Sequence, residues 1–246
     1  MGQVVDTQSA AEFMREVSQK ISLAELDALE QEVGEKSKLF QRVLAPEAIQ
    51  SVSSEDLKRV LRRIFSIRRR LAVIHARHPH DELKSLIAEL LYGQSELPVR
   101  FQYFCEQVKE LDETLSSDFA SELLHYTRPD EYWLWTRWMW DPQTDTGALR
   151  LVTMDEIDLQ GRSLAEIYMK VGEAVAIVNA TSEAVGLIRM GEQRFGLDVF
   201  LACVYGIYTY TVLRMRMTQE FNNVMPKLPE LASRLLGVWE KKVSGI

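Results

Sequence analysis

Hydrophobic residues recur at helical spacing along most of the chain, and this pattern predicts an all-α fold. The clearest run lies between Ser54 and His78, where apolar residues at 3.5-residue spacing define one seam. The residues of this seam are Val60, Ile64, Ile67, Leu71 and Ile74. Elsewhere Ser22 and Glu25 stand at capping-box spacing and mark a helix start. We expect an irregular bundle of about eight to ten helices.

The segment that follows Gly196 is apolar on nearly all sides, which indicates a buried central helix. The stretch from Phe195 to Leu213 is nearly long enough to cross a membrane. Asp198, three tyrosines and two threonines within it argue against a span. We therefore expect no membrane contact.

No internal repeat, low-complexity tract or linker divides the sequence. Residues 1–246 are accordingly predicted to form a single helical domain, and the alternative is that residues 1–45 form a separate N-terminal helical lobe. Turn-forming residues after Pro142 interrupt the helical pattern, and one short β-hairpin over residues 148–160 is the local alternative to helix.

Tryptophan is concentrated in one place, because four of the five tryptophans lie between Arg128 and Gly147. Pro129 has its φ preset for a first helical position, and Pro142 disfavours helix at the residue before it. These signals predict a short helix over residues 129–140, with tryptophans on two opposite sides. We expect this helix to be a core element around which the other segments pack.

Within that predicted helix, Trp133 and Trp140 share a face, and Arg137 falls close to them. His125 precedes the same segment, and an imidazole beside indole rings is a candidate general acid or base. The sequence thus offers a ligand pocket formed by His125, Trp133, Arg137 and Trp140. Packing without any ligand is the alternative explanation for these aromatic residues.

Composition narrows the functional classes. With 246 residues, 46 % of them hydrophobic, and only 12 glycines and 7 prolines, the chain is typical of a globular helical protein. A net charge of −7 argues against a general nucleic-acid or membrane-surface binder. Cys105 and Cys203 are far apart amid apolar residues and predict buried free thiols, and the N-terminus lacks a secretory signal. We expect a cytoplasmic protein.

Positive charge is nevertheless concentrated in the apolar run described first. From Lys58 to Arg77 there are eight cations and no acid. Because like charges at helical spacing repel, so dense a stripe implies an anionic group nearby. The candidate partner-binding residues are Arg59, Arg62, Arg63, Arg70 and Arg77. The anion could belong to an acidic partner protein, to a nucleic acid, or to the acidic segments of the same chain.

Candidate metal sites are weak. His75, His78, His80 and Asp81 are residue types that bind zinc, but the neighbouring arginines repel a divalent cation. The oxygen-rich loop from Asp141 to Gly147 lacks the acidic ladder and terminal Glu of an EF-hand. We expect neither a metal nor a cofactor.

The common catalytic motifs are missing from the sequence. It contains no phosphate-binding GxxxxGK[ST] loop, no dinucleotide fingerprint, no GxSxG elbow, no HExxH and no paired CxxC. The leading hypothesis is therefore a non-catalytic accessory or regulatory protein that binds a macromolecular partner through its arginine-rich helix face and adjacent aromatic surface. A nucleic-acid-binding module using the same face is one alternative, and an enzyme or small-ligand binder with a Trp-lined pocket is the other. Association of the chain with itself stays open.

Overall fold

The computed structural model describes residues 4–108, 110–184, 194–216 and 226–239. Within these ranges it contains ten α-helices, two short 3-10 segments and no β-strand. The predicted all-α fold is confirmed. A linked set of buried hydrophobic residues reaches from Val5 to Val238 and forms the core.

The helices follow one another along the chain, and η2 lies in the long connection between α7 and α8. The α-helices are α1 (Thr7–Lys20), α2 (Leu23–Val43), α3 (Ser54–Leu61), α4 (Leu71–Arg77), α5 (His80–Tyr92), α6 (Leu97–Gln107), α7 (Glu113–Thr127), α8 (Leu164–Ala184), α9 (Gly196–Arg216) and α10 (Leu228–Leu235). The two 3-10 segments are η1 (Ile49–Ser51) and η2 (Leu149–Leu151).

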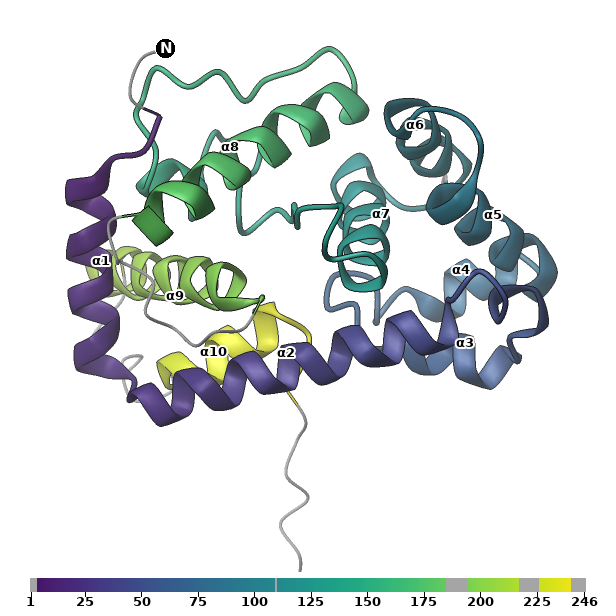
Figure 1. Cartoon of the computed structure of the whole chain (residues 1–246), viewed down its shortest axis with the longest axis horizontal. Helices are drawn as coiled ribbons and strands as arrows, with labels where there is room; N and C mark the ends of the chain where they lie inside the picture. The colour runs from purple at the N-terminus through teal and green to yellow at the C-terminus, as the bar shows by residue number, and fades with distance from the viewer. Residues whose placement is uncertain (1–3, 109, 185–193, 217–225, 240–246) are drawn as a thin grey trace, which may run out of the picture.

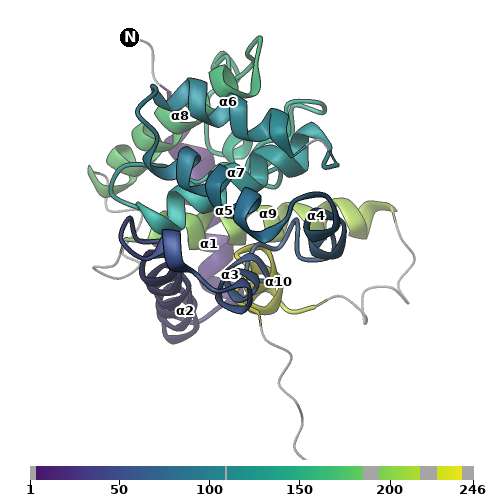
Figure 2. The ribbon, with the colours of Figure 1, turned by 90° about the vertical axis from the view of Figure 1, so that its right-hand side faces the viewer.

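Helix α7 is the centre of the arrangement (Figure 1). It packs against α2, α5, α6 and α8, and all of its residues from Leu115 to Thr127 are buried. Helices α1 and α2 meet at a corner and run along two edges, while α8 lies across the molecule from α2. Both α3 and α10 contact α2, and turning the molecule by 90° shows all three in its lower part (Figure 2).

Local signals set several helix ends as expected. Ser22 and Glu25 form the predicted capping box, in which each side chain accepts from the backbone N–H of the other residue. Helix α5 ends at Tyr92, directly before Gly93. Helix α2 continues through Gly34, where nothing lies within 4 Å of the position that a Cβ would occupy.

The arginine-rich run is not one continuous helix, so that prediction is wrong. Helix α3 ends at Leu61, turns follow, and α4 begins at Leu71. The apolar seam is still buried, since Val60, Ile64 and Ile67 are each 0 % exposed. Tighter 3-10-type bonds, such as Arg63 N–H to the Val60 carbonyl, replace the α-helical pattern in the turns. This break interrupts a stripe of like charges that would repel along a regular helix.

The tryptophan segment is not a helix either. Residues 128–140 consist of turns and extended backbone, and residues 148–160 contain η2 and turns without a hairpin. Isolated bridges join Val5 to Thr153 and Asp141 to Thr146. The extended backbone persists because side chains of α7 supply the hydrogen bonds that a helix would have made internally.

Among the described residues, no helix combines the length and the apolar character that crossing a membrane requires. Helix α9 is instead buried within the fold, as predicted, through residues such as Phe200, Ala202 and Cys203.

Candidate functional site

The tryptophan segment, residues 128–147, lies along α7 and is fixed by polar side chains of that helix. Ser121 Oγ accepts from Trp135 N–H at 2.7 Å, and Asp118 Oδ1 accepts from Arg137 N–H at 2.8 Å. Ser121 and Asp118 lie on successive turns of α7, and their partners Trp135 and Arg137 are alternate residues of the segment. The helix and the segment therefore run in opposite directions. Without Ser121, the Trp135 N–H would be buried without a partner.

His125 extends this set of contacts by one more helical step. Its Nδ1 lies 2.8 Å from the Tyr132 carbonyl and its Nε2 lies 2.8 Å from Asp198 Oδ2. Burial lowers the pKa of His125, but the Asp198 carboxylate and both hydrogen bonds outweigh this effect and raise it overall. Both neighbours of the ring are oxygen acceptors, so this geometry favours the imidazolium, which donates from both nitrogens. With neither nitrogen available, it cannot act as a general base in this geometry.

The predicted ligand pocket of His125, Trp133, Arg137 and Trp140 is divided among three places. His125 is buried against Asp198. Trp133 lines a hollow of about 380 Å³ beside α8. Arg137 and Trp140 line a separate cavity of about 140 Å³. The division follows from the absence of the predicted helix, which would have placed Trp133, Arg137 and Trp140 close to one another on one face.

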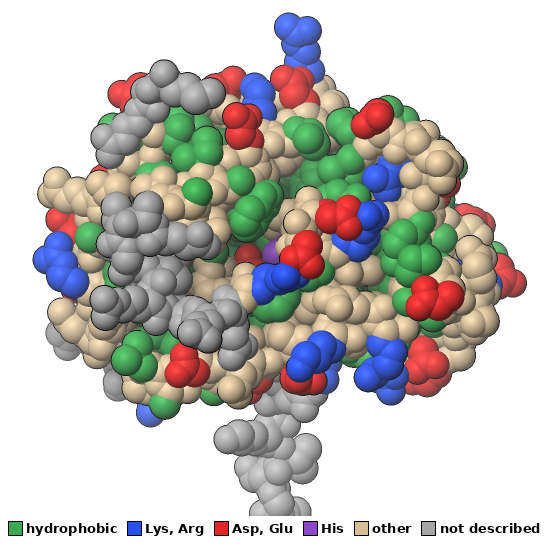
Figure 3. All heavy atoms as spheres, in the orientation of Figure 1, with side chains coloured by type: hydrophobic (Ala, Val, Ile, Leu, Met, Phe, Trp, Pro, Cys, Tyr) green, Lys and Arg blue, Asp and Glu red, His purple; other side chains and the backbone are tan. Residues whose placement is uncertain are grey.

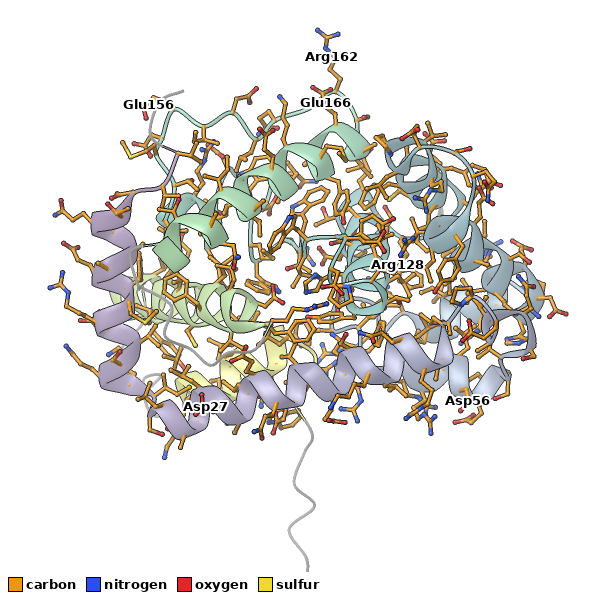
Figure 4. All side chains as sticks on the ribbon, viewed as in Figure 1. Asp27, Asp56, Arg128, Glu156, Arg162 and Glu166 are labelled. Atoms are coloured by element: carbon orange, nitrogen blue, oxygen red, sulfur yellow. The ribbon has the colours of Figure 1, made fainter. Side chains whose placement is uncertain are left out.

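The hollow at Trp133 opens on the face shown in Figure 3, where hydrophobic side chains gather between α8 and α6. Its apolar wall includes Leu97, Met169 and the ring of Trp133, which lies 3.8 Å from the Cβ position of Gly172. Arg128 lies beside it in the centre of the same face and forms an ion pair with Glu131 (Figure 4). The hollow at Trp133 is thus bordered by an ion pair formed within the chain.

A second set of charged groups is fully buried next to α7. Lys36 of α2 donates to Glu122 Oε2 at 2.7 Å and to the Leu236 carbonyl at 2.8 Å. Its ammonium also lies 3.8 Å from the centre of the Tyr126 ring. Burial lowers the pKa of Lys36 and raises that of Glu122, while their ion pair opposes both shifts. We call Glu30, Lys36, Glu122, His125 and Asp198 the buried charged network.

Glu30 completes this network from α2. The residue is 1 % exposed, and burial raises its pKa to about 7. The negative charges of Asp27 and Asp198 raise this pKa further, while hydrogen bonds from the backbone of Phe195 and Gly196 lower it. The network therefore ties α2, α7 and α9 together through ionisable groups. Buried ion pairs of this kind are costly to break, which suits a structural role.

His78 and His80, at the junction of α4 and α5, are each held by contacts within the fold. His78 lies 2.6 Å from Glu82 and 2.7 Å from Glu110, and His80 lies 2.9 Å from the Val52 carbonyl. The part of the chain that the structure describes holds no group of three or more His, Cys, Asp or Glu that could bind a metal ion. In the loop after Trp140, Asp145 accepts from the Trp140 indole and from Arg150.

Three of the five predicted arginines lie close to acidic residues of the same chain. Arg59 pairs with Asp56 at 3.0 Å and Arg62 pairs with Glu55 at 3.7 Å, both on the outer side of α3, where Figure 4 labels Asp56. Arg63 is half-buried and lines a groove of about 1260 Å³ against the acidic residues of α2. For these three residues, acid of the same chain supplies part of the counter-charge.

The arginines further along are arranged differently. Arg69, Arg70 and Arg77 are exposed, and none forms an ion pair with an acidic residue in the described ranges. Arg68 stacks on Phe65 at 4.6 Å, and its pKa is lowered by burial and by the nearby charges of Arg69 and Arg234. We call the exposed arginines of this edge the arginine surface: Arg59, Arg62, Arg69, Arg70 and Arg77.

Sequence reasoning missed the polar stripe of α7, which positions the tryptophan segment. The signal was present, because Asp118, Ser121 and His125 recur at i, i+3 and i+7 and therefore share one face of a helix. A polar stripe on a helix that is buried all round indicates that another segment must satisfy it. Which segment does so depends on tertiary packing and is not written in the local pattern.

The chain matches no protein-family model, no curated protein and no solved structure.

Proposed function

We propose that this protein is a non-catalytic accessory protein of the cytoplasm that binds an acidic macromolecular partner through the arginine surface. The observation that carries the proposal is the exposure of Arg69, Arg70 and Arg77 without an acidic partner in the described residues. Their position on the turns before α4 and at its end leaves them open at the edge of the molecule.

The charge pattern favours a binding surface over a set of arginines that only contact solvent. Five arginines fall within residues 62–70, in a chain whose net charge is −7. Exposed arginines close together repel one another, and this cost is offset when an anionic partner binds. Since Arg59 and Arg62 already have acidic neighbours, the attraction should come mainly from the other three.

The non-catalytic part of the proposal rests on the nucleophiles and bases that the fold buries. Both ring nitrogens of His125 are occupied. Burial raises the pKa of the free thiols Cys105 and Cys203 to about 12 each, which makes them unreactive at neutral pH. Buried free thiols also suit the reducing cytoplasm.

An acidic protein surface fits better than a nucleic acid. Three unpaired arginines would neutralise few phosphates, while the remaining surface of a chain at net charge −7 repels a polyanion of high charge density. A protein partner can present a small acidic patch that matches the arginine surface. It can also reach the exposed Val73 on α4, which is 43 % exposed.

The test compares two triple variants of equal charge change. Arg69→Glu/Arg70→Glu/Arg77→Glu alters the arginine surface, and Arg15→Glu/Lys20→Glu/Lys38→Glu alters exposed cations on α1 and α2. Binding of a twelve-residue glutamate-rich peptide and of a twelve-nucleotide single strand is measured by fluorescence anisotropy at two salt concentrations.

We expect the unaltered protein to bind the peptide. The first variant should bind it at least tenfold more weakly, and the second variant should bind it as tightly as the unaltered protein does. Stronger binding of the oligonucleotide, with a logarithmic salt slope near −2 (about −0.7 for each of three phosphates), would favour the nucleic-acid alternative. Peptide binding that is the same in both variants would overturn the assignment to the arginine surface. If the first variant alone loses peptide binding, proteins that co-purify with the native chain and not with this variant identify the partner.

A further inference from the structure

A small cavity lies between the start of α7, the tryptophan segment and the start of α8. Its volume is about 140 Å³. The apolar part of its wall is formed by Trp135, Trp140, Leu164 and Ile167. The cavity is independent of the arginine surface, which lies on other elements.

The two tryptophans offer this cavity only apolar surface. The indole N–H of Trp135 donates to the Trp140 carbonyl at 3.0 Å, and that of Trp140 donates to Asp145 Oδ1 at 2.9 Å. Both donors are therefore used within the fold. A ligand that touched these rings would find hydrocarbon-like walls.

The polar end of the cavity holds Asp118 and Arg137. Asp118 is 4 % exposed, and among the described residues the hydrogen bond to its carboxyl group comes from Arg137 N–H. A buried carboxyl group with one oxygen satisfied leaves hydrogen-bonding capacity directed at the space it lines. The Arg137 side chain is exposed and has no acidic partner in the described ranges.

The protonation state of Asp118 follows from its surroundings. Burial raises its pKa to about 8, and the nearby negative charges of Glu122 and Asp112 add to this effect, against the Arg137 backbone bond and guanidinium. Glu113 also lines the cavity, and Glu122 is itself paired with Lys36. At neutral pH the group is therefore mostly a neutral acid that can donate a hydrogen bond.

We propose that this cavity binds a short monocarboxylate, whose carboxylate lies between the side chains of Arg137 and Asp118 and whose hydrocarbon tail contacts Trp135 and Ile167. A guanidinium with a neutral hydrogen-bond donor beside it is suited to a carboxylate, because both groups donate and one carries the opposite charge. A cavity of about 150 Å³ holds a molecule the size of benzene, so the ligand has roughly six to eight non-hydrogen atoms.

The proposal makes a signed pH prediction. As pH rises through about 8, Asp118 loses its proton and its negative charge repels the ligand carboxylate, so binding weakens. Binding of a cation would change in the opposite direction. Asn at position 118 keeps an N–H donor without titrating, and the variant Asp118→Asn should bind with little dependence on pH between 6 and 9.

The experiment uses the full chain with butanoate, pentanoate and butylamine as probes. Tryptophan emission and calorimetry report binding, since Trp135 and Trp140 line the cavity. Arg137→Gln removes the cation among the residues that line the cavity. Arg162→Gln is the matched control, because Figure 4 shows Arg162 pointing away from the molecule at the start of α8. Thermal melting verifies that each variant is folded.

We expect pentanoate to bind, Arg137→Gln to weaken it at least tenfold, and Arg162→Gln to leave it unchanged. Butylamine that binds more tightly than pentanoate would overturn the proposal, as would equal binding in both arginine variants. No heat and no emission change with any probe up to 10 mM would leave water as the occupant of the cavity and would also overturn it. Because Arg137 is exposed, its variant stays informative even if Asp118→Asn fails to fold.

Discussion

Helix α7 and the arginine surface both carry polar side chains among hydrophobic residues, but they differ in whether these side chains have partners within the chain. On α7, Ser121, Glu122 and His125 each find a partner from a segment far away in the sequence. On the arginine surface, Arg70 and Arg77 have no acidic partner in the described ranges. The difference separates polar groups that specify the fold from polar groups that are free to bind something else.

The largest effect is expected where a buried charge loses its partner. Replacing Lys36 by Met leaves Glu122 buried without its cation, and this should lower the free energy of unfolding by about 3–5 kcal/mol. Urea denaturation provides the measurement. The double variant Lys36→Met/Glu122→Leu should recover most of the loss, because no charge then remains without a partner. A double variant as unstable as the single one would show that the ion pair is not the cause.

A smaller effect should appear in the dependence of stability on pH. The pKa values of Glu30 and Asp118 are raised to about 7 and about 8, and that of His125 is also raised. For each group the folded state binds the proton more tightly than the unfolded state does. Stability is therefore greatest below the unfolded pKa of each group and is lost as pH rises through the folded pKa.

We expect the titration of Glu30 alone to lower the free energy of unfolding by about 2 kcal/mol between pH 5 and pH 7, and the titration of Asp118 to add to this fall. Denaturation at a series of pH values measures the slope. The variant Glu30→Gln should reduce the slope between pH 5 and pH 7, since the titrating carboxyl group has been removed. Stability that rises over this range would contradict the protonation states given to the buried groups.

Removing one hydrogen bond between α7 and the tryptophan segment should have an intermediate effect. Ser121→Ala leaves the Trp135 N–H buried without an acceptor, at a cost of about 1–2 kcal/mol. Ser116→Ala is the matched control, because its hydroxyl donates to Glu113 within the same helix. Amide hydrogen exchange should show faster exchange at Trp135 in the first variant alone. Equal stability of the two variants would mean that the segment is held by packing.

The smallest effect on stability is expected at the arginine surface. Replacing Arg69, Arg70 and Arg77 by Gln removes charges that repel one another and have no described acidic partner, so the free energy of unfolding should change by at most about 0.5 kcal/mol. Thermal melting at low and high salt measures this change. A loss of 2 kcal/mol or more would mean that these arginines support the fold, and would remove the contrast with α7.

The same contrast explains what could be predicted from the sequence. Helix starts and ends that depend on neighbouring residues were predictable, as at Ser22 with Glu25 and at Gly93. The burial of Ile64 and Ile67 was predicted correctly even though the backbone around them leaves the helix. Burial follows from hydrophobic spacing, and spacing of 3.5 residues tolerates short turns of tighter helix.

The tryptophan segment could not be predicted in this way. Its flanking prolines and acidic residues favour a helix, but Asp118 and Ser121 capture its backbone N–H groups from another element. Such tertiary bonds override local preference and leave no trace in the segment itself. The predicted pocket residues were therefore divided, while Asp118, which lies nineteen positions before Arg137, became the neighbour of that residue.

The partners of Lys36 also bear on how the chain acquires its structure during synthesis. Glu122 lies 86 positions and Leu236 lies 200 positions further along the sequence. A ribosome releases the N-terminal part of a chain first, so the ammonium of Lys36 must stay hydrated until late in translation. The core around α7 can thus close only when nearly the whole chain has emerged, and contacts this distant in sequence slow folding.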